Sequence, residues 1–158
     1  MVDKVPMTAT GYERLKQELH RLKTVERPLN VKEIETAIAH GDLSENAEYH
    51  AAKEKQSHIA GRIDQIDDRI ARAQVIDPSG QEPDRVRFGA TVVLEDSESG
   101  EEVSYRIVGE DESDVAQGLI SVTSPVARAL MNKEPDDEVT VKVPKGTRTF
   151  EILKIRYE

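Results

Sequence analysis

The chain of 158 residues is long enough for one full domain or two small ones. Charged residues make up 34% of it and the net charge is −9, so any contact with nucleic acid is expected to be weak or indirect. It has no cysteine, which excludes disulfides and thiolate metal sites. No stretch approaches the roughly 18 apolar residues of a membrane span, and the first residues are too polar for a secretory signal. The sequence therefore predicts a cytoplasmic protein that does not bind membranes.

Apolar residues in the first forty positions recur with a helical period. Thr8 is a suitable N-cap for a helix that begins at Ala9. One stripe then follows at spacings of three and four, made by Leu15, Leu19, Leu22 and Val25 and then by Val31, Ile34 and Ile38. Pro28 lies between the two parts of the stripe, and a proline inside a helix costs about 3 kcal/mol. One kinked helix and two jointed helices both fit, and the resumed stripe favours one kinked helix.

A second helical pattern follows almost at once. Gly41 is the natural end of the first helix, because glycine takes left-handed backbone angles without steric cost. We expect the next helix to begin at Asp42 or Ser44. Its stripe has coiled-coil spacing and consists of Ala52, Ile59, Ile63, Ile66, Ile70 and Ala73. Residues 1–77 are thus predicted to form an antiparallel coiled-coil hairpin, roughly 50 Å long, with its tip at residues 40–49.

The apolar pattern changes in the second half of the chain. Residues 78–83 have the composition of a linker, and beyond them the period is two, which is typical of strands. The predicted strands are residues 86–94, 103–107, 119–122, 139–143 and 150–157. Ser124 and Pro125 form an N-cap followed by proline at the first helical position, which opens a short helix. Residues 84–158 are therefore predicted to be an α+β domain with an antiparallel sheet and one short helix.

Two carboxylates stand three residues apart at the predicted tip. Asp42 and Glu45 can lie on the same side of a helix start. Such a pair can hold a hard divalent ion such as Mg²⁺, but two protein oxygens are too few for a private site, so a partner or a substrate phosphate would supply further ligands. The same spacing is also that of a capping box, which contributes on the order of 1 kcal/mol to a helix. Residue types alone favour the capping box, and both roles can hold in part.

Other candidate residues carry less information. His40, His50 and His58 follow no recognised metal-ligand spacing and are interpreted as exposed or partly packed side chains. Tyr49 is interpreted as a packing residue near the tip. The sequence has neither a glycine-rich phosphate loop nor a nucleophile elbow, so no self-contained active site is predicted.

Several segments, read in chain order, are specific enough to indicate a family. They are PMT at 6–8, HGDLSENAEYHAAKEKQ at 40–56, AQVID at 73–77, FGATV at 88–92, YRIVG at 105–109, ISV at 120–122 and SPVAR at 124–128. This set resembles the bacterial Gre transcript cleavage factors, and the GreA type more than the GreB type. The resemblance extends over essentially the full chain, and the tip motif is its most specific part.

The resemblance implies a mechanism. The C-terminal domain would be similar to the FKBP fold and would dock at the rim of the secondary channel of bacterial RNA polymerase, while the coiled coil passes down the channel. Asp42 and Glu45 would help to hold a Mg²⁺ ion shared with the polymerase and would orient the attacking water. Backtracked RNA would then be cut from its 3′ end by the polymerase's own nuclease activity, so this protein would be an accessory factor and not an enzyme. For docking we expect Ser121, Ser124, Pro125 and nearby loop residues.

The sequence departs from the family pattern in two places. Some relatives carry an arginine just before the His-Gly-Asp motif, where this chain has Ile38 and Ala39. Lys53 occupies a position where arginine is common in the family. A contact that arginine would make with two parallel hydrogen bonds would here be made by the single charged amine of lysine. In the second helix acidic residues interrupt the basic ones, which favours the GreA type and weak RNA binding along the arm.

Two rival functions fit the same architecture. The first is a polymerase inhibitor that occupies the channel; its tip should differ in the number or spacing of carboxylates, and the Asp42/Glu45 pair argues against it. The second is a prolyl isomerase, because that activity occurs on the FKBP fold. Isomerase pockets are lined with aromatic side chains, and the second half of this chain offers only Phe88, Tyr105, Phe150 and Tyr157.

Overall fold

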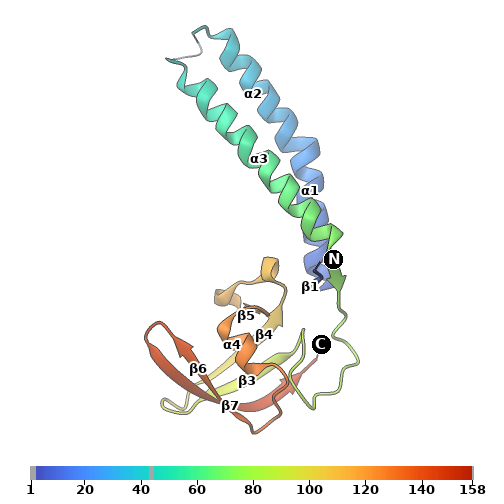
Figure 1. Cartoon of the computed structure of the whole chain (residues 1–158), viewed down its shortest axis with the longest axis vertical. Coiled ribbons are helices and arrows are strands. Elements are labelled where there is room, and N and C mark those ends of the chain that lie inside the picture. Colours follow the sequence, from blue (N-terminus) through green and yellow to red (C-terminus); the bar gives the residue numbers. More distant parts are fainter. Residues whose placement is uncertain (1–2, 43–44, 158) are drawn as a thin grey trace. The chain divides into compact units, whose positions relative to one another are not determined.

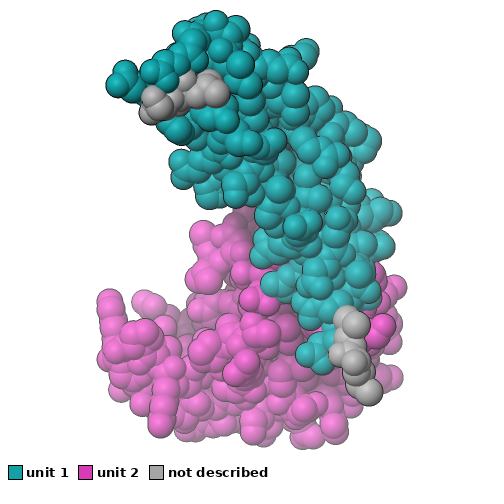
Figure 2. Space-filling model, turned by 45° about the horizontal axis from the view of Figure 1, so that its top comes forward, with its two compact units in different colours: residues 1–3, 12–73 teal, residues 4–11, 74–158 magenta. Residues whose placement is uncertain are grey.

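The structure is a computed structural model that describes residues 3–42 and 45–157. The chain forms two compact units (Figure 2). The helical unit consists of residues 1–3 and 12–73, and the second unit, which is built around a sheet, consists of residues 4–11 and 74–158. The predicted combination of a long helical region with a sheet domain is therefore confirmed. Residues 4–11 were expected in the hairpin but fall in the second unit.

A small sheet explains the position of this N-terminal segment. Strand β1 (Val5–Met7) pairs with strand β2 (Ala73–Val75), and the N–H of Ile76 donates to the carbonyl of Met7 at 2.9 Å. Three-residue strands are too short to give a clear period-two pattern, so the sequence did not predict them. Ala73, expected in the helical stripe, lies in β2.

The first helical arm continues past Pro28 without a break. Helix α1 (Ala9–Arg21), a π-helical turn (Leu22–Glu26) and helix α2 (Arg27–Ala39) follow one another directly. In the π-turn the N–H of Arg27 donates to the carbonyl of Leu22, five residues back, so the regular hydrogen-bond pattern is already shifted before the proline. Of the predicted single kinked helix, the continuity across Pro28 is confirmed, and the π-turn is the local adjustment that accompanies the proline.

The π-turn also changes which face of α2 is buried. Leu15 is buried and Leu19 and Leu22 are half-buried, as predicted. Val25, Val31 and Ile38, however, are 44%, 42% and 49% exposed, so their predicted place in the stripe is wrong. The buried or half-buried positions beyond the turn are Asn30, Ile34 and Ala37. A π-turn takes up one residue more than an α-turn, so the buried face continues at Asn30 and not at Leu29, where a constant seven-residue repeat from Leu15 and Leu22 would put it.

Helix α3 (Ala47–Ala71) forms the second arm. Its predicted stripe is confirmed, since Ala52, Ile59, Ile63 and Ile66 are buried and Ile70 is half-buried. Figure 1 shows α2 and α3 side by side, joined by a short turn at one end.

Contacts between the arms run in reverse order along the chain. Glu18 of α1 pairs with Arg62 at 2.7 Å, and nearer the turn Asn30 donates to the carbonyl of Ala52 at 2.9 Å. Asn30 is 1% exposed, and a buried polar side chain of this kind fixes the register of two helices.

The second unit contains a five-stranded sheet in the order β5-β4-β3-β7-β6. Its elements are β3 (Thr91–Asp96), β4 (Glu102–Val108), β5 (Leu119–Ser121), helix α4 (Pro125–Leu130), β6 (Glu138–Val143) and β7 (Gly146–Arg156). All five predicted strands are present. The expectation of a wholly antiparallel sheet is wrong, because β5 pairs parallel to β4 after a connection that contains two short 3₁₀ turns.

The core of this unit lies between α4 and one face of the sheet. Ala127 and Leu130 of α4 have no exposed surface, and they pack with alternate residues of the strands such as Val92, Leu94 and Ile152. Burying one large apolar side chain contributes about 1.5–3 kcal/mol, so this cluster dominates the stability of the unit. The predicted first strand starts late, at Thr91, although Val86 and Phe88 before it are buried.

Candidate functional site

The turn between the arms starts at a well-defined helix end. His40 is the C-cap of α2, and its N–H donates to the carbonyl of Ala37. Gly41 follows with φ of +114°, outside the range that side chains tolerate, and its N–H donates to the carbonyl of Ile38 at 3.2 Å. The predicted helix stop at Gly41 is confirmed.

The start of α3 differs from the prediction. Asn46 is its N-cap, and the Asn46 Oδ1 atom accepts a hydrogen bond from the N–H of Tyr49 at 3.0 Å. The expected start at Asp42 is therefore wrong, and so is the capping-box role of the Asp42/Glu45 pair for this helix; the alternative start at Ser44 lies outside the described residues. Asn46 is a functional candidate that the sequence analysis missed, although asparagine is among the best N-cap residues. Its signal was hidden because Asp42 and Ser44, equally good caps, precede it.

The two tip carboxylates lie in the turn itself. Asp42 and Glu45 are both exposed and both line one hollow at the tip. The other residues of this hollow are His40, Asn46, Ala47 and Glu48. Within the helical unit, the turn lies at the ends of α2 and α3 that point away from α1 (Figure 1). The structure thus brings the two predicted site residues, both of them exposed, to one concave surface at the tip.

These carboxylates fit part of a magnesium site. Mg²⁺ is a hard cation that prefers oxygen ligands in octahedral geometry and is commonly held by one or two carboxylates together with waters and substrate phosphates. Asp42 and Glu45 supply ligands of that chemistry. In residues 3–42 and 45–157 no group of three or more His, Asp or Glu side chains is placed to hold a metal ion.

The histidines near the tip are exposed, as expected. His40 Nδ1 lies 3.5 Å from Glu48 Oε2 across the turn, and His58 Nε2 lies 3.7 Å from Glu54 Oε1 along α3. The ring of Tyr49, which is half-buried, meets the ring of His50 edge to face. Contacts of this kind fit packing and surface roles. Among the described helices, none has both the length and the apolar character needed to cross a membrane.

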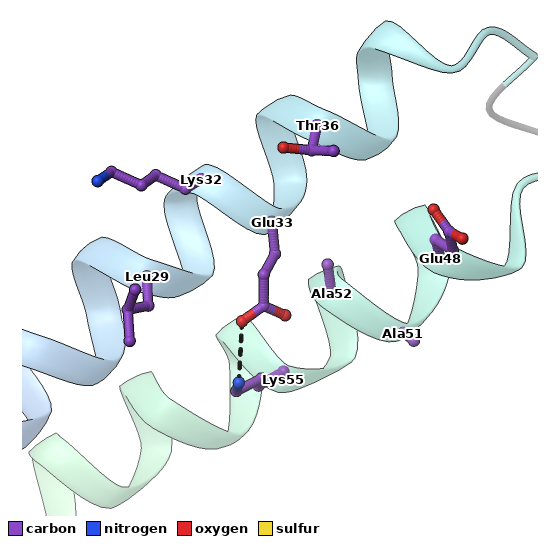
Figure 3. Close-up of a pocket in the computed structure, with 8 residues that line it drawn as sticks. All are labelled: Leu29, Lys32, Glu33, Thr36, Glu48, Ala51, Ala52 and Lys55. Carbon is purple, nitrogen blue, oxygen red and sulfur yellow. Dashed lines mark hydrogen bonds and ion pairs between the residues drawn. The ribbon is translucent and has the colours of Figure 1, made fainter.

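A second hollow lies along the arm between α2 and α3 (Figure 3). It is lined by Leu29, Lys32, Glu33, Thr36, Glu48, Ala51, Ala52 and Lys55. Glu33 and Lys55 point toward each other across it, with Oε1 and Nζ 3.0 Å apart. An exposed ion pair of this kind contributes about 0.2–1 kcal/mol, so it helps to hold the two helices together.

The predicted docking residues come together at the start of α4. Ser124 is the N-cap, because its Oγ atom accepts from the N–H of Ala127 at 3.2 Å. The same hydroxyl donates to the carbonyl of Ser121 at 2.7 Å, and Ser121 Oγ in turn lies 2.7 Å from Thr123 Oγ1. Both serine hydroxyls are therefore part of the local turn, while Pro125 is exposed on the surface of the first helical turn.

Two family models match the chain. One is described as transcription elongation factor, N-terminal, and matches residues 5–75; the other is transcription elongation factor, GreA/GreB, C-term, and matches residues 81–157. Similar proteins include a transcription elongation factor GreA of Anaeromyxobacter sp. (strain K), 61% identical over 99% of this chain and 94% of that protein. Another, from Alkalilimnicola ehrlichii, is 57% identical over 99% of both chains.

Solved structures give a further comparison. A structure of the transcription factor Gfh1 aligns with 99% of both chains at 31% identity, with a TM-score of 0.48. The two family models together cover nearly the whole chain, and the two GreA proteins are similar to it over 94% and 99% of their lengths. The chain belongs to the GreA/GreB family of transcription elongation factors.

Proposed function

We propose that this protein binds bacterial RNA polymerase, inserts its helical arm into the secondary channel and stimulates the polymerase's own endonucleolytic cleavage of backtracked RNA. The observation that carries the proposal is the placement of Asp42 and Glu45, both exposed on one hollow at the end of the arm. Removal of the displaced 3′ segment returns an RNA end to the catalytic centre, so the arrested complex resumes elongation.

The tip acids act in the catalytic centre of the partner. In two-metal phosphoryl transfer both ions must be bound, since they stabilise the attacking and the leaving oxygens. Asp42 and Glu45 supply carboxylate ligands for a Mg²⁺ ion shared with the polymerase, and they orient the attacking water by accepting its hydrogen bonds. The bond-breaking activity belongs to the polymerase, so the protein is an accessory factor and not an enzyme.

The two units have separate tasks in this proposal. Helices α1, α2 and α3, the helical part of the predicted hairpin of residues 1–77, act as an antiparallel coiled coil, an assignment supported by the reversed order of the contacts between the arms. Residues 84–158 act as an FKBP-like docking domain whose contact surface includes Ser121, Ser124 and Pro125, and residues 78–83 link the two. The site of action is the cytoplasm, where bacterial RNA polymerase works.

Contact with the RNA along the arm is weak. Arg62 Nε lies 2.7 Å from the carboxylate of Glu18, and Arg72 Nη2 lies 2.8 Å from that of Asp68. Lys53, where relatives often have arginine, donates to the side chain of Gln56 at 2.8 Å. Because the two arginines are already paired with carboxylates of the protein, they offer little free positive charge to a phosphate backbone, whereas Lys53, bonded to a neutral amide, keeps its charge.

The test is a transcript-cleavage assay on polymerase stalled in a backtracked complex. Addition of the full chain is expected to release short RNA fragments from the 3′ end and to restore elongation. The rival function, a channel-occupying inhibitor, predicts the opposite result. If the chain binds the stalled complex and slows elongation while releasing no 3′ fragments, the proposed function is wrong.

A further inference from the structure

We propose that Asn46 is a positioning residue that fixes the placement of Asp42 and Glu45 by linking the ends of α2 and α3. The inference deepens the proposed function and rests on it. Asn46 does not itself touch the reacting groups in this proposal. It acts through the turn that carries the two acids.

One side chain makes both links. Asn46 Oδ1 accepts from the N–H of Tyr49 in the first turn of α3 at 3.0 Å. Asn46 Nδ2 donates to the carbonyl of Ala37 in the last turn of α2 at 2.7 Å. Ala37 is buried, with 2% of its surface exposed, so this carbonyl belongs to a part of α2 that is packed in place. The amide of Asn46 thus spans the gap between the two helix ends.

The link closes the turn that holds the acids. Asp42 and Glu45 both lie between Ala37 and Asn46 in the sequence, so the hydrogen bond from Asn46 to Ala37 closes a loop that contains them. Helix ends fray when their terminal groups lack partners. A further contact across the turn, between His40 and Glu48, is exposed and 3.5 Å long, and such pairs contribute little.

A similar bond elsewhere on the arm offers a control. Asn30 Nδ2 donates to the carbonyl of Ala52, so it also joins one helix to the backbone of the other. Asn30 lies on the far side of Ala37 from the turn, outside the loop that contains the acids. Loss of this bond loosens the arm, whereas loss of the bond between Asn46 and Ala37 releases the turn.

Two substitutions separate the link from the cap. Asn46→Ser keeps a good N-cap acceptor but is too short to reach Ala37. Asn46→Asp keeps both the cap acceptor and the length of the side chain but has no donor for the carbonyl of Ala37. Asn30→Ser is the matched control, because it removes the corresponding bond away from the acids.

Three measurements are made on each full-length variant. The first is the maximal rate of stimulated cleavage at saturating protein, with its dependence on Mg²⁺ concentration. The second is the affinity for polymerase, measured by competition with the unaltered chain. The third is the distribution of distances between nitroxide labels at Thr36 of α2 and Ala51 of α3, which flank the hollow of Figure 3. The chain has no cysteine, so cysteines introduced at these two positions are labelled selectively.

The expected result is specific to the turn. Loss of a group that orients a metal ligand typically costs about 10–100-fold in affinity or activity. Both Asn46 variants should therefore lose at least about tenfold in maximal cleavage rate and need more Mg²⁺, with unchanged affinity for polymerase and a broader distance distribution. Asn30→Ser should lose less activity than either of them.

Two results would overturn the inference. One is an unaltered cleavage rate in both Asn46 variants. The other is a lost rate with an unaltered distance distribution, which would mean that Asn46 acts directly and not by positioning. If the unaltered chain itself fails to stimulate cleavage, the proposed function is wrong, and the distance distribution alone then decides whether Asn46 holds the turn.

Discussion

Two glycines of the sheet-containing unit share a left-handed backbone but differ in their surroundings. Gly80 has φ of +80° and Gly89 has φ of +88°. A Cβ atom on Gly89 would lie 2.5 Å from the Cβ of Pro78, whereas a Cβ on Gly80 would meet nothing within 4 Å. The backbone angle explains why both positions favour glycine, and only Gly89 also needs the space.

This difference gives a prediction for stability. Gly80→Ala should lower the free energy of unfolding by about 1–2 kcal/mol, the cost of a side chain in the left-handed region. Gly89→Ala should cost clearly more, because Pro78 must also move. Urea unfolding of the two variants measures the difference. Equal costs would show that the packing of Pro78 against Gly89 does not contribute.

Asp96 is a nearly buried carboxylate with well-placed donors. Arg148 Nη2 donates to it at 2.7 Å, and the backbone N–H groups of Glu98 and Ser99 donate to it at 2.9 and 3.3 Å. The Arg148 guanidinium, followed by these two N–H groups, holds the pKa of Asp96 below its ordinary value of 3.8. The ionised form is therefore favoured by folding.

The lowered pKa predicts how stability depends on pH. The stabilisation from Asp96 is fully present above its unfolded pKa of 3.8 and is lost as the pH falls through its lower folded pKa. Asp96→Asn should therefore destabilise the protein at neutral pH, and this difference should shrink below pH 3.8. Urea unfolding from pH 7 down to pH 3 measures it. A difference that stays constant over this range would contradict the assignment.

Single residues that follow local rules could be predicted from the sequence. Thr8, Gly41 and Ser124 were placed correctly, because a cap or a left-handed turn depends only on a few neighbouring residues. Asn46 could not be singled out. Several good N-cap residues occur in a row at the tip, and only the packing of α3 against α2 decides which of them begins the helix.

At the scale of elements, the π-turn before Pro28 decides which side chains are buried. Sequence periodicity placed Val31 and Ile38 on the buried face, but the structure buries Asn30 and Ala37 instead. Leu15 and Leu22 are seven residues apart, so a constant repeat would next bury Leu29; the extra residue of the π-turn moves the buried position on by one, to Asn30. The proline and the interrupted stripe indicate that the helix geometry must change locally near Pro28. They do not show whether the helix kinks, breaks or forms a π-turn.

Deletion of Thr24 tests this interpretation when it is combined with Pro28→Ala. The deletion removes the extra residue and the substitution removes the proline, so a regular helix should keep Asn30 and Ala37 buried with little change in stability. Deletion of Glu35 in the same background is the control. It should cost about 1–3 kcal/mol, because Ile38 then replaces Ala37 at a site packed for a small residue.

Urea unfolding of the two deletion variants compares their free energies of unfolding. A deletion of Thr24 that costs as much as the deletion of Glu35 would show that the π-turn does not set the buried face of α2.

At the scale of the whole molecule, the fold class followed from the sequence, whereas two features of topology did not. Apolar residues recur with helical spacing in the first half of the chain and alternate with polar ones in the second half. This change of period was enough to locate both the helical region and the strands. β1 pairs with β2, which lies far from it in the sequence, and β5 lies parallel to β4, although it directly follows β4 in strand order. Local patterns carry no information about such partners, so only the structure could show them.

The proposed docking surface can be tested without disturbing the fold. Pro125 is the first residue of α4 and is exposed. Pro125→Asp should be tolerated there, since an acid is favourable in the first turn of a helix, but it puts a charge on the proposed contact surface. We expect the affinity for polymerase to fall at least about tenfold.

The control for this variant is Thr147→Asp. It adds the same charge at an exposed position of β7, where Thr147 pairs with Lys142 of β6. Competition binding to polymerase compares the two. If both variants bind as well as the unaltered chain, α4 is not part of the docking surface.

The central claim is that the acids at the end of the arm act inside the polymerase. The most direct test is the maximal rate of transcript cleavage at saturating full-length protein for Asp42→Ala, Glu45→Ala and Glu35→Ala. The last variant removes an exposed acid from the same arm, away from the tip. We predict that the two tip variants lose about a hundredfold or more in rate while Glu35→Ala keeps the full rate. Release of RNA fragments by Asp42→Ala and Glu45→Ala as fast as by Glu35→Ala would contradict the account.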